Sequence, residues 1–107
     1  NFVSSLLEEG ENIWVGTNSG LYIYDRSTDR FSYFNETTRY GVFVSSEVKK
    51  IIKTQSGLIW IATLGQGVFI YEPVTGVLTQ NSIHTSFVWD ICQSADSRIY
   101  AGRTILF

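Results

Sequence analysis

The side chains that could do metal or nucleophilic chemistry are few, and they are scattered along the sequence. The one histidine, His84, lies in a short polar stretch. The one cysteine, Cys92, has no second cysteine or histidine at the spacing that metal sites use. We therefore predict no metal site and no bound cofactor. Hydrophobic alternation places Cys92 on a strand, where we expect a buried thiol without a chemical role.

Two carboxylate pairs and two glycine-bearing stretches could suggest catalysis, but their surroundings argue against it. Glu8 with Glu9, and Asp25 with Asp29, fall in or next to expected turns, where carboxylates commonly bond the backbone. Glycosidase carboxylates need a fixed separation across a cleft, which such turns do not provide. The glycines at 17–21 and 63–67 do not precede helices, so they lack the amide array that binds phosphate. We expect no enzymatic activity from this chain.

The composition fits a folded domain, or part of one, that binds neither nucleic acid nor a bilayer interior. Of the 107 residues, 44% are hydrophobic and 15% aromatic, enough for a packed core. The net charge is -2, and no basic cluster offers the footprint that phosphate backbones demand. The longest apolar runs are a few residues, too short to cross a membrane.

A repeated pattern must position all of these residues. The stretch IWVGTNSGLYIYD at 13–25 returns as IWIATLGQGVFIYE at 59–72, and a clipped third copy, IYAGRTILF, occupies 99–107. The copies start roughly 40 to 46 residues apart, the range of propeller blades. Alternating β-branched and aromatic residues predict four short strands per unit. These strands are expected at 3–8, 12–17, 21–24 and 30–34, and again at 48–53, 58–63, 67–71 and 77–81.

The predicted fold class is therefore all-β: a fragment of a β-propeller with two four-stranded blades and the first half of a third. We assign blade 1 to residues 1–40, blade 2 to 41–86 and a partial third blade to 87–107. Strand alternation puts Trp14 and Gly16 on one face of their strand, and Trp60 and Ala62 on the matching face. A large ring beside a tiny residue predicts inter-blade packing, in which the tiny residue lets a neighbouring sheet approach.

These residues resemble the two-component-regulator propeller repeat, which builds the extracytoplasmic sensor region of bacterial hybrid two-component systems. The repeat has an apolar-Trp-apolar-Gly-Thr strand, then Gly, then an apolar-aromatic strand ending in Tyr-Asp, and a Thr-Gly turn. Asp29 stands where the repeat has glycine. The matching residues of the first copy are Trp14, Gly16, Thr17, Gly20, Leu21, Tyr24 and Asp25. Those of the second copy are Trp60, Thr63, Gly65, Gly67, Tyr71, Thr75 and Gly76.

The resemblance implies part of a periplasmic propeller that senses oligosaccharides and signals through a membrane helix to a cytoplasmic histidine kinase. The parent would be an inner-membrane protein. Two alternatives stay open: a propeller lyase or hydrolase, which would need a His, Glu or Tyr cluster at the central channel, and a protein-binding propeller scaffold. The ligand and the number of blades are not determined by the sequence.

In a propeller, the connections between blades and those between second and third strands emerge on one face. Aromatic rings there can stack on sugars, while Arg, Asn and Gln can donate to hydroxyls. For Tyr40 and Phe43 the competing interpretation is that they only pin a long loop to the sheet. The candidate ligand-binding residues are Asn18, Arg39, Tyr40, Phe43, Gln66 and His84.

Two blades and a half cannot close a ring, since propellers have about four to eight blades. The end strands would then expose unpaired backbone groups, which template the pairing of further strands. We therefore expect this chain to be a fragment that pairs with the remaining blades of a parent propeller, or with another copy of itself.

Overall fold

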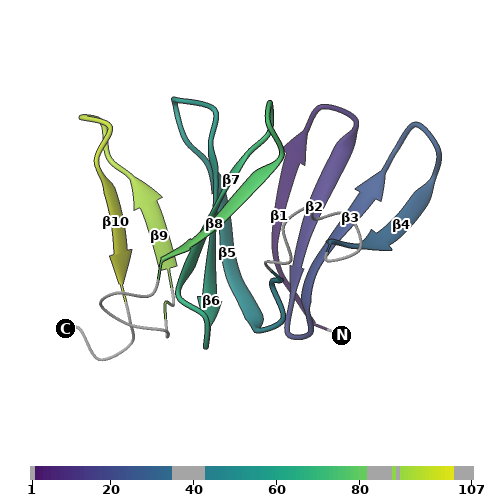
Figure 1. The fold of residues 1–107 in the computed structure, drawn as a ribbon, viewed down its shortest axis with the longest axis horizontal. Helices are drawn as coiled ribbons and strands as arrows, with labels where there is room; N and C mark the ends of the chain where they lie inside the picture. The colour runs from purple at the N-terminus through teal and green to yellow at the C-terminus, as the bar shows by residue number, and fades with distance from the viewer. Residues whose placement is uncertain (1, 35–42, 82–87, 89, 103–107) are drawn as a thin grey trace.

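In the computed structural model the described residues are 2–34, 43–81, 88 and 90–102, and they form ten strands in three antiparallel sheets (Figure 1). Blade 1 comprises β1 (Val3–Glu9), β2 (Asn12–Thr17), β3 (Gly20–Asp25) and β4 (Arg30–Tyr33). Blade 2 comprises β5 (Glu47–Lys53), β6 (Ile59–Leu64), β7 (Val68–Glu72) and β8 (Val77–Asn81). The third sheet comprises β9 (Asp90–Gln93) and β10 (Ile99–Gly102).

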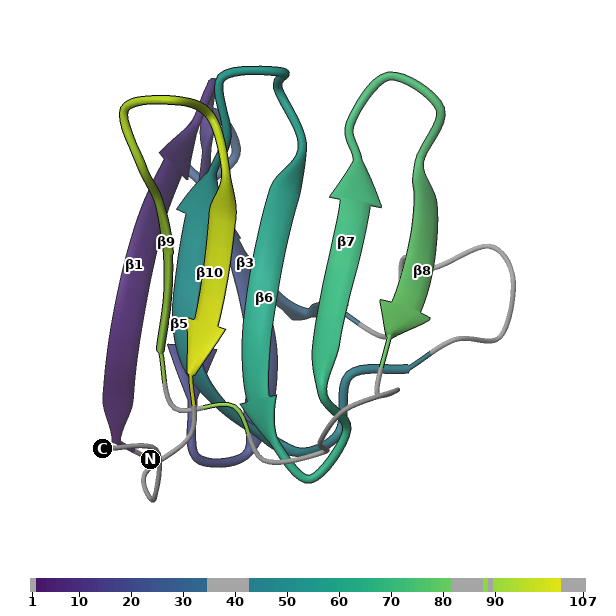
Figure 2. The ribbon, with the colours of Figure 1, turned by 90° about the vertical axis from the view of Figure 1, so that its left-hand side faces the viewer.

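Each complete sheet is a meander in which every strand pairs with the next one along the chain, in the orders β1-β2-β3-β4 and β5-β6-β7-β8. The three sheets stand face to face in sequence, and Figure 2 shows β8 at the side of the stack away from β1, β5 and β9. The predicted fold class, a β-propeller fragment with two blades and part of a third, is confirmed. Among the described residues, no helix is long and apolar enough to cross a membrane.

The turns take the backbone conformations that their residues allow. Gly76 has φ 76°, as expected for the turn between β7 and β8. Asp29, at the corresponding turn of blade 1, has φ 55°. Asp tolerates this left-handed region better than most residues. The substitution of Asp for the glycine of the repeat therefore preserves the turn.

The core between blades 1 and 2 is built around Trp14, as the alternation predicts. Its ring is 4% exposed, and its centroid lies 5.2 Å from that of Phe34 and 5.0 Å from that of Tyr71 on blade 2. A Cβ at Gly16 would lie 2.6 Å from Cγ1 of Val48, so the two sheets meet where the side chain is missing. The buried members of this core are Trp14, Leu21, Phe34, Val44, Val48, Ile51, Ile59, Ile61, Phe69 and Leu78.

The inner strands of both blades carry a β-bulge at the same place, which the sequence pattern did not reveal. The register shifts between Val3 and Ser5 in β1, and between Val48 and Lys50 in β5. Ser4 and Ser5, which lie at the first bulge, form hydrogen bonds with the neighbouring blade. The Ser4 hydroxyl donates to the Val48 carbonyl, and Ser5 Oγ accepts from the Ile51 amide at 3.0 Å. The bulge thus directs two hydroxyls across the gap between β1 and β5.

The contact between blade 2 and the third sheet is smaller. Its buried residues are Ala62, Val68, Val88 and Ile91, with Trp60 packed against them and only partly buried. The indole Nε1 of Trp60 is buried and has no hydrogen-bond partner within the described part of the chain. The prediction of a buried Cys92 is wrong. Cys92 is exposed because it follows the buried Ile91 on β9 and therefore faces the other side of the sheet.

Candidate functional site

The turns between second and third strands and the described end of the connection between the blades, residues 43–46, lie at one end of the molecule (Figure 1). We call this the loop end; among the described residues it comprises 17–20, 43–46 and 63–67. Both of its turns are closed by a buried threonine. Thr17 Oγ1 donates to the Gly20 carbonyl at 2.9 Å, and Thr63 Oγ1 donates to the Gly67 carbonyl at 2.7 Å.

Gln66 links its turn to the connection between the blades. Its Oε1 accepts from the amides of Ser45 and Ser46, both at 2.8 Å, and its Nε2 donates to the Phe43 carbonyl at 2.9 Å. Three of the hydrogen bonds that the Gln66 amide can make are therefore used within the protein. The side chain holds the connection in place, and within the described part of the chain one of its N–H groups has no partner.

The other candidate residues divide between the described and undescribed parts of the chain. Asn18 Oδ1 accepts from the Phe2 amide at 3.1 Å, so it fixes the start of blade 1. The Phe43 side chain is 50% exposed at the loop end, beside the Gln66 hydrogen bonds. Arg39, Tyr40 and His84 lie outside the described residues. The structure thus brings Phe43 and Gln66 together, and their binding role stays a prediction.

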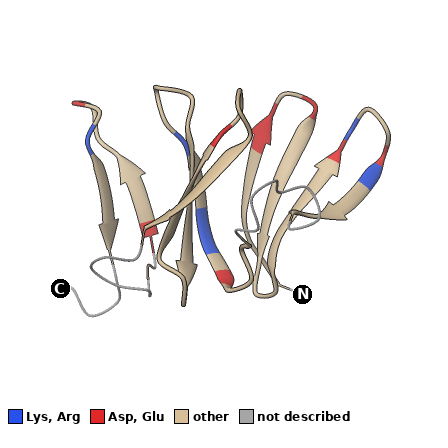
Figure 3. Ribbon diagram, viewed as in Figure 1, with Lys and Arg blue, Asp and Glu red and all other residues tan. Residues whose placement is uncertain are grey.

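The described loop-end segments 17–20, 43–46 and 63–67 contain no charged residue, but Glu47 follows directly at the start of β5 and pairs with Lys49 at 3.4 Å. The opposite end of the molecule is rich in charge. Figure 3 shows acidic and basic residues along the turns opposite the loop end, with a further group low on β5. One such pair joins Arg26 Nη1 to Glu8 Oε2 at 2.7 Å, and another joins Lys53 of blade 2 to Glu9 of blade 1. Exposed pairs of this kind contribute little stability. The described loop-end segments therefore offer mainly hydroxyl and amide groups to a polar ligand.

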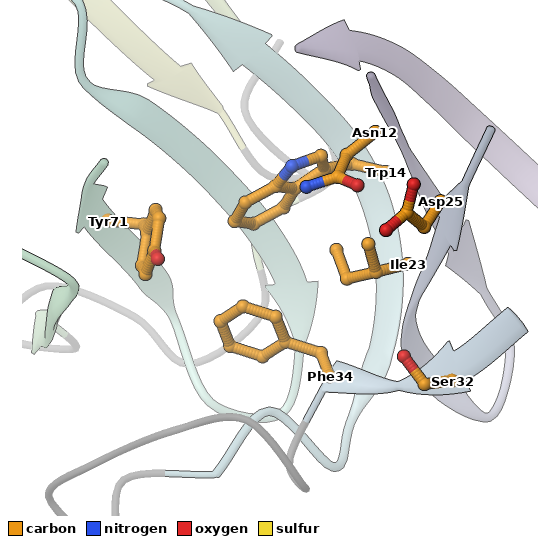
Figure 4. A pocket seen from close by; sticks show the side chains of 7 residues that line it. All are labelled: Asn12, Trp14, Ile23, Asp25, Ser32, Phe34 and Tyr71. Carbon is orange, nitrogen blue, oxygen red and sulfur yellow. The ribbon is translucent and has the colours of Figure 1, made fainter. Parts of the chain in front are cut away.

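A cavity of about 300 Å³ opens between the outer strands of blade 1 and Tyr71 of blade 2 (Figure 4). Three aromatic rings form one side of the cavity. The polar groups of three other residues, all on blade 1, point toward the cavity. Trp14 and Phe34 are each less than 5% exposed, so they offer little ring surface to a ligand. The lining residues are Asn12, Trp14, Ile23, Asp25, Ser32, Phe34 and Tyr71.

Asp25 supplies the negative charge of this cavity and also builds the adjacent turn. Its Oδ1 accepts from the Ser27 hydroxyl at 2.6 Å and from the Ser27 amide at 2.9 Å. These hydrogen bonds, from the hydroxyl first and then the amide, lower the pKa of Asp25 below its usual value. The carboxylate is therefore ionised at neutral pH, and much of its accepting capacity is used by the turn.

Two separate sequence signals point to residues of this cavity, but nothing in the sequence joins them. Trp14 was expected in the inter-blade core and Asp25 in a turn. Only the pairing of β2 with β3, which sets Asn12 opposite Asp25, places these groups on one wall. The cavity could hold a small polar molecule, but within its described lining no nucleophile is paired with a base. No group of three potential metal ligands occurs among the described residues either.

Comparison with solved structures identifies the architecture. The extracellular domain of BT4673 from B. thetaiotaomicron, assigned as a hybrid two-component system, aligns over 94% of this chain with a TM-score of 0.72 and 22% identity. The extracellular domain of BT3049 from the same organism, assigned likewise, aligns over 94% with a TM-score of 0.71 and 22% identity. The chain has the fold of these extracellular domains.

A second crystal structure of the BT4673 domain, described there as a one-component system, aligns with a TM-score of 0.72 at 17% identity. The chain spans only 13% to 14% of the length of these domains, so it corresponds to a small part of each. At these identities the likeness establishes the fold. No family model matches the sequence, and no curated protein matches it.

Proposed function

We propose that this chain is a segment of an extracytoplasmic, ligand-sensing β-propeller in a bacterial hybrid two-component system. The observation that carries the proposal is its alignment over 94% of its length with extracellular domains of such systems. The parent protein would place the propeller in the periplasm and pass the signal through the membrane to a histidine kinase. In this role the segment binds a ligand or relays a signal, and it catalyses no reaction.

We further propose that the ligand is a neutral oligosaccharide and that it meets this segment at the loop end. The exposed Phe43 ring can stack on a sugar face, and the remaining N–H of Gln66 can donate to a sugar hydroxyl. Segments 17–20, 43–46 and 63–67 contain no charged residue, and the adjoining Glu47 and Lys49 neutralise each other in an ion pair, which favours a neutral sugar over an acidic one. The alternatives of a propeller lyase or hydrolase and of a protein scaffold have no comparable support in the described residues.

The test is a calorimetric titration of the chain with two sets of probes, neutral and uronic-acid-containing oligosaccharides. We expect binding of at least one neutral oligosaccharide, and Phe43→Ala should weaken it at least tenfold. Val74→Ala is the matched control, because Val74 is an equally apolar but more exposed residue in the turn between β7 and β8, away from the loop end. Binding only of acidic probes, or equal loss in both variants, would contradict the proposed site.

A further inference from the structure

The cavity between blade 1 and Tyr71 is lined by one charged group, Asp25, which is half-buried. Its hydrogen bonds come from the neutral hydroxyl and amide of Ser27. Among the described residues no basic side chain forms an ion pair with Asp25, and this includes Arg30, which lies opposite it in the register of β3 and β4. A partly buried carboxylate loses hydration that only an opposite charge replaces well, so the cavity favours a cation.

Two further oxygen acceptors lie with Asp25 on the wall of this cavity. Asn12 is opposite Asp25 on β2, and Ser32 comes from β4 (Figure 4). Neither the Asn12 amide nor the Ser32 hydroxyl has a side-chain hydrogen-bond partner within the described part of the chain. Both bonds from Ser27 fall on Oδ1 of Asp25, so Oδ2 keeps accepting capacity. A carboxylate, an amide oxygen and a hydroxyl oxygen match the three N–H donors of a primary ammonium group.

The matching positions of blade 2 do not carry this set of acceptors. Leu58 stands at the position of Asn12, directly before the Ile-Trp pair of the repeat. Thr79 stands at the position of Ser32, but its hydroxyl donates to the Ile70 carbonyl at 3.4 Å. Blade 2 forms the same four-stranded sheet without a free amide and a free hydroxyl at these places. The polar groups of Asn12 and Ser32 are therefore not required by the strand pairing that both blades share.

The three aromatic rings of the cavity pack against one another and do not enclose a cation. The Trp14 centroid lies 5.2 Å from that of Phe34 and 5.0 Å from that of Tyr71, and the last two lie 5.7 Å apart. Rings at these separations are in contact, which leaves no room between their faces for an ammonium group. The cation must therefore be held by oxygens. This favours a primary ammonium group over a quaternary one, which has no N–H to donate.

We propose that this cavity binds a small primary ammonium compound. The ammonium group donates to Asp25, Asn12 and Ser32. The carbon chain packs against Ile23 and Tyr71, which are only partly buried by the core. The volume of about 300 Å³ is at the lower end of ligand pockets, so the compound has only a few carbon atoms.

This site is separate from the loop end. Asn12 begins β2 and Asp25 ends β3, whereas the turn that joins these strands at the loop end lies between Thr17 and Gly20. The inference therefore goes beyond the proposed function and does not depend on it, because a sugar at the loop end and an ammonium compound in the cavity meet different residues.

The test is a titration of the nitrogen-15-labelled chain with n-butylammonium, followed by NMR through the indole N–H signals. Trp14 lines the cavity and Trp60 does not, so the Trp14 signal should move to saturation while the Trp60 signal stays in place. Two matched probes are n-butanol, which lacks the charge, and butyltrimethylammonium, which keeps the charge but has no N–H donor. Each should bind at least fivefold more weakly than n-butylammonium, because each loses part of the interaction with the three oxygens.

Two variants assign the binding to the wall of the cavity. Asp25→Asn should weaken n-butylammonium binding at least tenfold, since it removes the charged acceptor. Because Asp25 also builds its turn, the second variant is Asn12→Leu, which installs the residue of blade 2 and should weaken binding at least threefold. Glu72→Gln is the matched control. Glu72 ends β7 and accepts from the amide two residues on, as Asp25 does in β3, and this variant should bind within twofold of the natural chain.

Three results would overturn the proposal. Equal binding of n-butylammonium and butyltrimethylammonium would show attraction to negative charge without recognition of the N–H donors. Equal movement of the Trp14 and Trp60 signals would place the compound elsewhere. Unchanged binding in Asn12→Leu would remove the wall of the cavity from the site. None of these probes is a sugar and none of the variants alters the loop end, so a failure here is distinguishable from a failure of the proposed function.

Discussion

Gly16 shows how a single missing side chain sets the distance between two blades. Its absent Cβ is the space into which Val48 packs, and the equivalent Ala62 on blade 2 leaves room for a methyl group only. The small residue at this position is therefore Gly at the contact of blades 1 and 2, and Ala at the contact of blade 2 with the third sheet. The tightest approach lies between blades 1 and 2, where the core is also largest.

We expect Gly16→Ala to destabilise the chain by about 1–3 kcal/mol, because the new methyl group would overlap Val48 Cγ1 and force the sheets apart. Urea denaturation followed by tryptophan fluorescence measures this loss. Adding Val48→Ala to the Gly16→Ala chain should cost less than Val48→Ala costs in the natural chain, since it removes the overlap. Strictly additive effects would show that the two residues do not meet.

At the level of elements, the polar turn residues hold strands and connections together more than they face solvent. Thr17 and Thr63 close equivalent turns, and Gln66 binds the connection that precedes β5. The turns at the opposite end are joined in a similar manner, since the Gln55 amide donates to Gln93 Oε1 at 2.9 Å and Ser97 Oγ donates to Gln55 Oε1 at 2.7 Å. Side-chain amides therefore hold the connection of blade 2 at the loop end and fasten blade 2 to the third sheet at the opposite end.

Gln66→Ala should loosen residues 43–46 without unfolding the blades. It removes two acceptors for backbone amides and one donor to a carbonyl, so the opening free energy at Ser45 and Ser46 should fall by about 1–2 kcal/mol. Amide hydrogen exchange at these two residues measures the change.

The control for this prediction is Gln80→Ala, which deletes only the hydrogen bond from Gln80 Nε2 to the Gln66 carbonyl. That variant should leave exchange at Ser45 and Ser46 nearly unchanged. If both variants have the same effect, the Gln66 side chain is not what holds the connection.

Across the molecule, Trp14 and Trp60 occupy equivalent positions but contribute unequally to the stability of the fold. Trp14 is enclosed by a complete blade on each side, whereas Trp60 packs against a sheet with two described strands and keeps an unpartnered Nε1. Since burial decides how much a large side chain contributes, stability is concentrated at the contact of blades 1 and 2.

We therefore expect Trp14→Ala to destabilise the chain by about 3–5 kcal/mol and Trp60→Ala by about 1–3 kcal/mol. Thermal unfolding by circular dichroism compares the two variants directly. Equal losses would mean that the third sheet covers Trp60 as fully as blade 2 covers Trp14.

The order of residues along the chain was enough to predict the strands, the repeat and the faces on which the rings lie. Two-residue alternation fixes which side chains share a face, and the returning Ile-Trp pattern with its turns fixes where each blade begins. For this reason the strand limits of the two blades, to within one residue, and the inter-blade role of Trp14 were predictable. The same reasoning failed for Cys92, because alternation gives opposite faces but not which face is covered.

The packing of the sheets in the fold determines what covers each face and which partners the polar side chains bond. The cavity beside Asp25, the Gln66 connection and the serine contacts across the bulge all join residues far apart in sequence. A bulge shifts register without leaving a signature in the hydrophobic pattern, so the direction of Ser4 and Ser5 could not be foreseen. Leu6 and Phe31 of blade 1 are likewise exposed while the apolar residues at the same positions of blade 2 are buried, because burial depends on which sheet packs alongside.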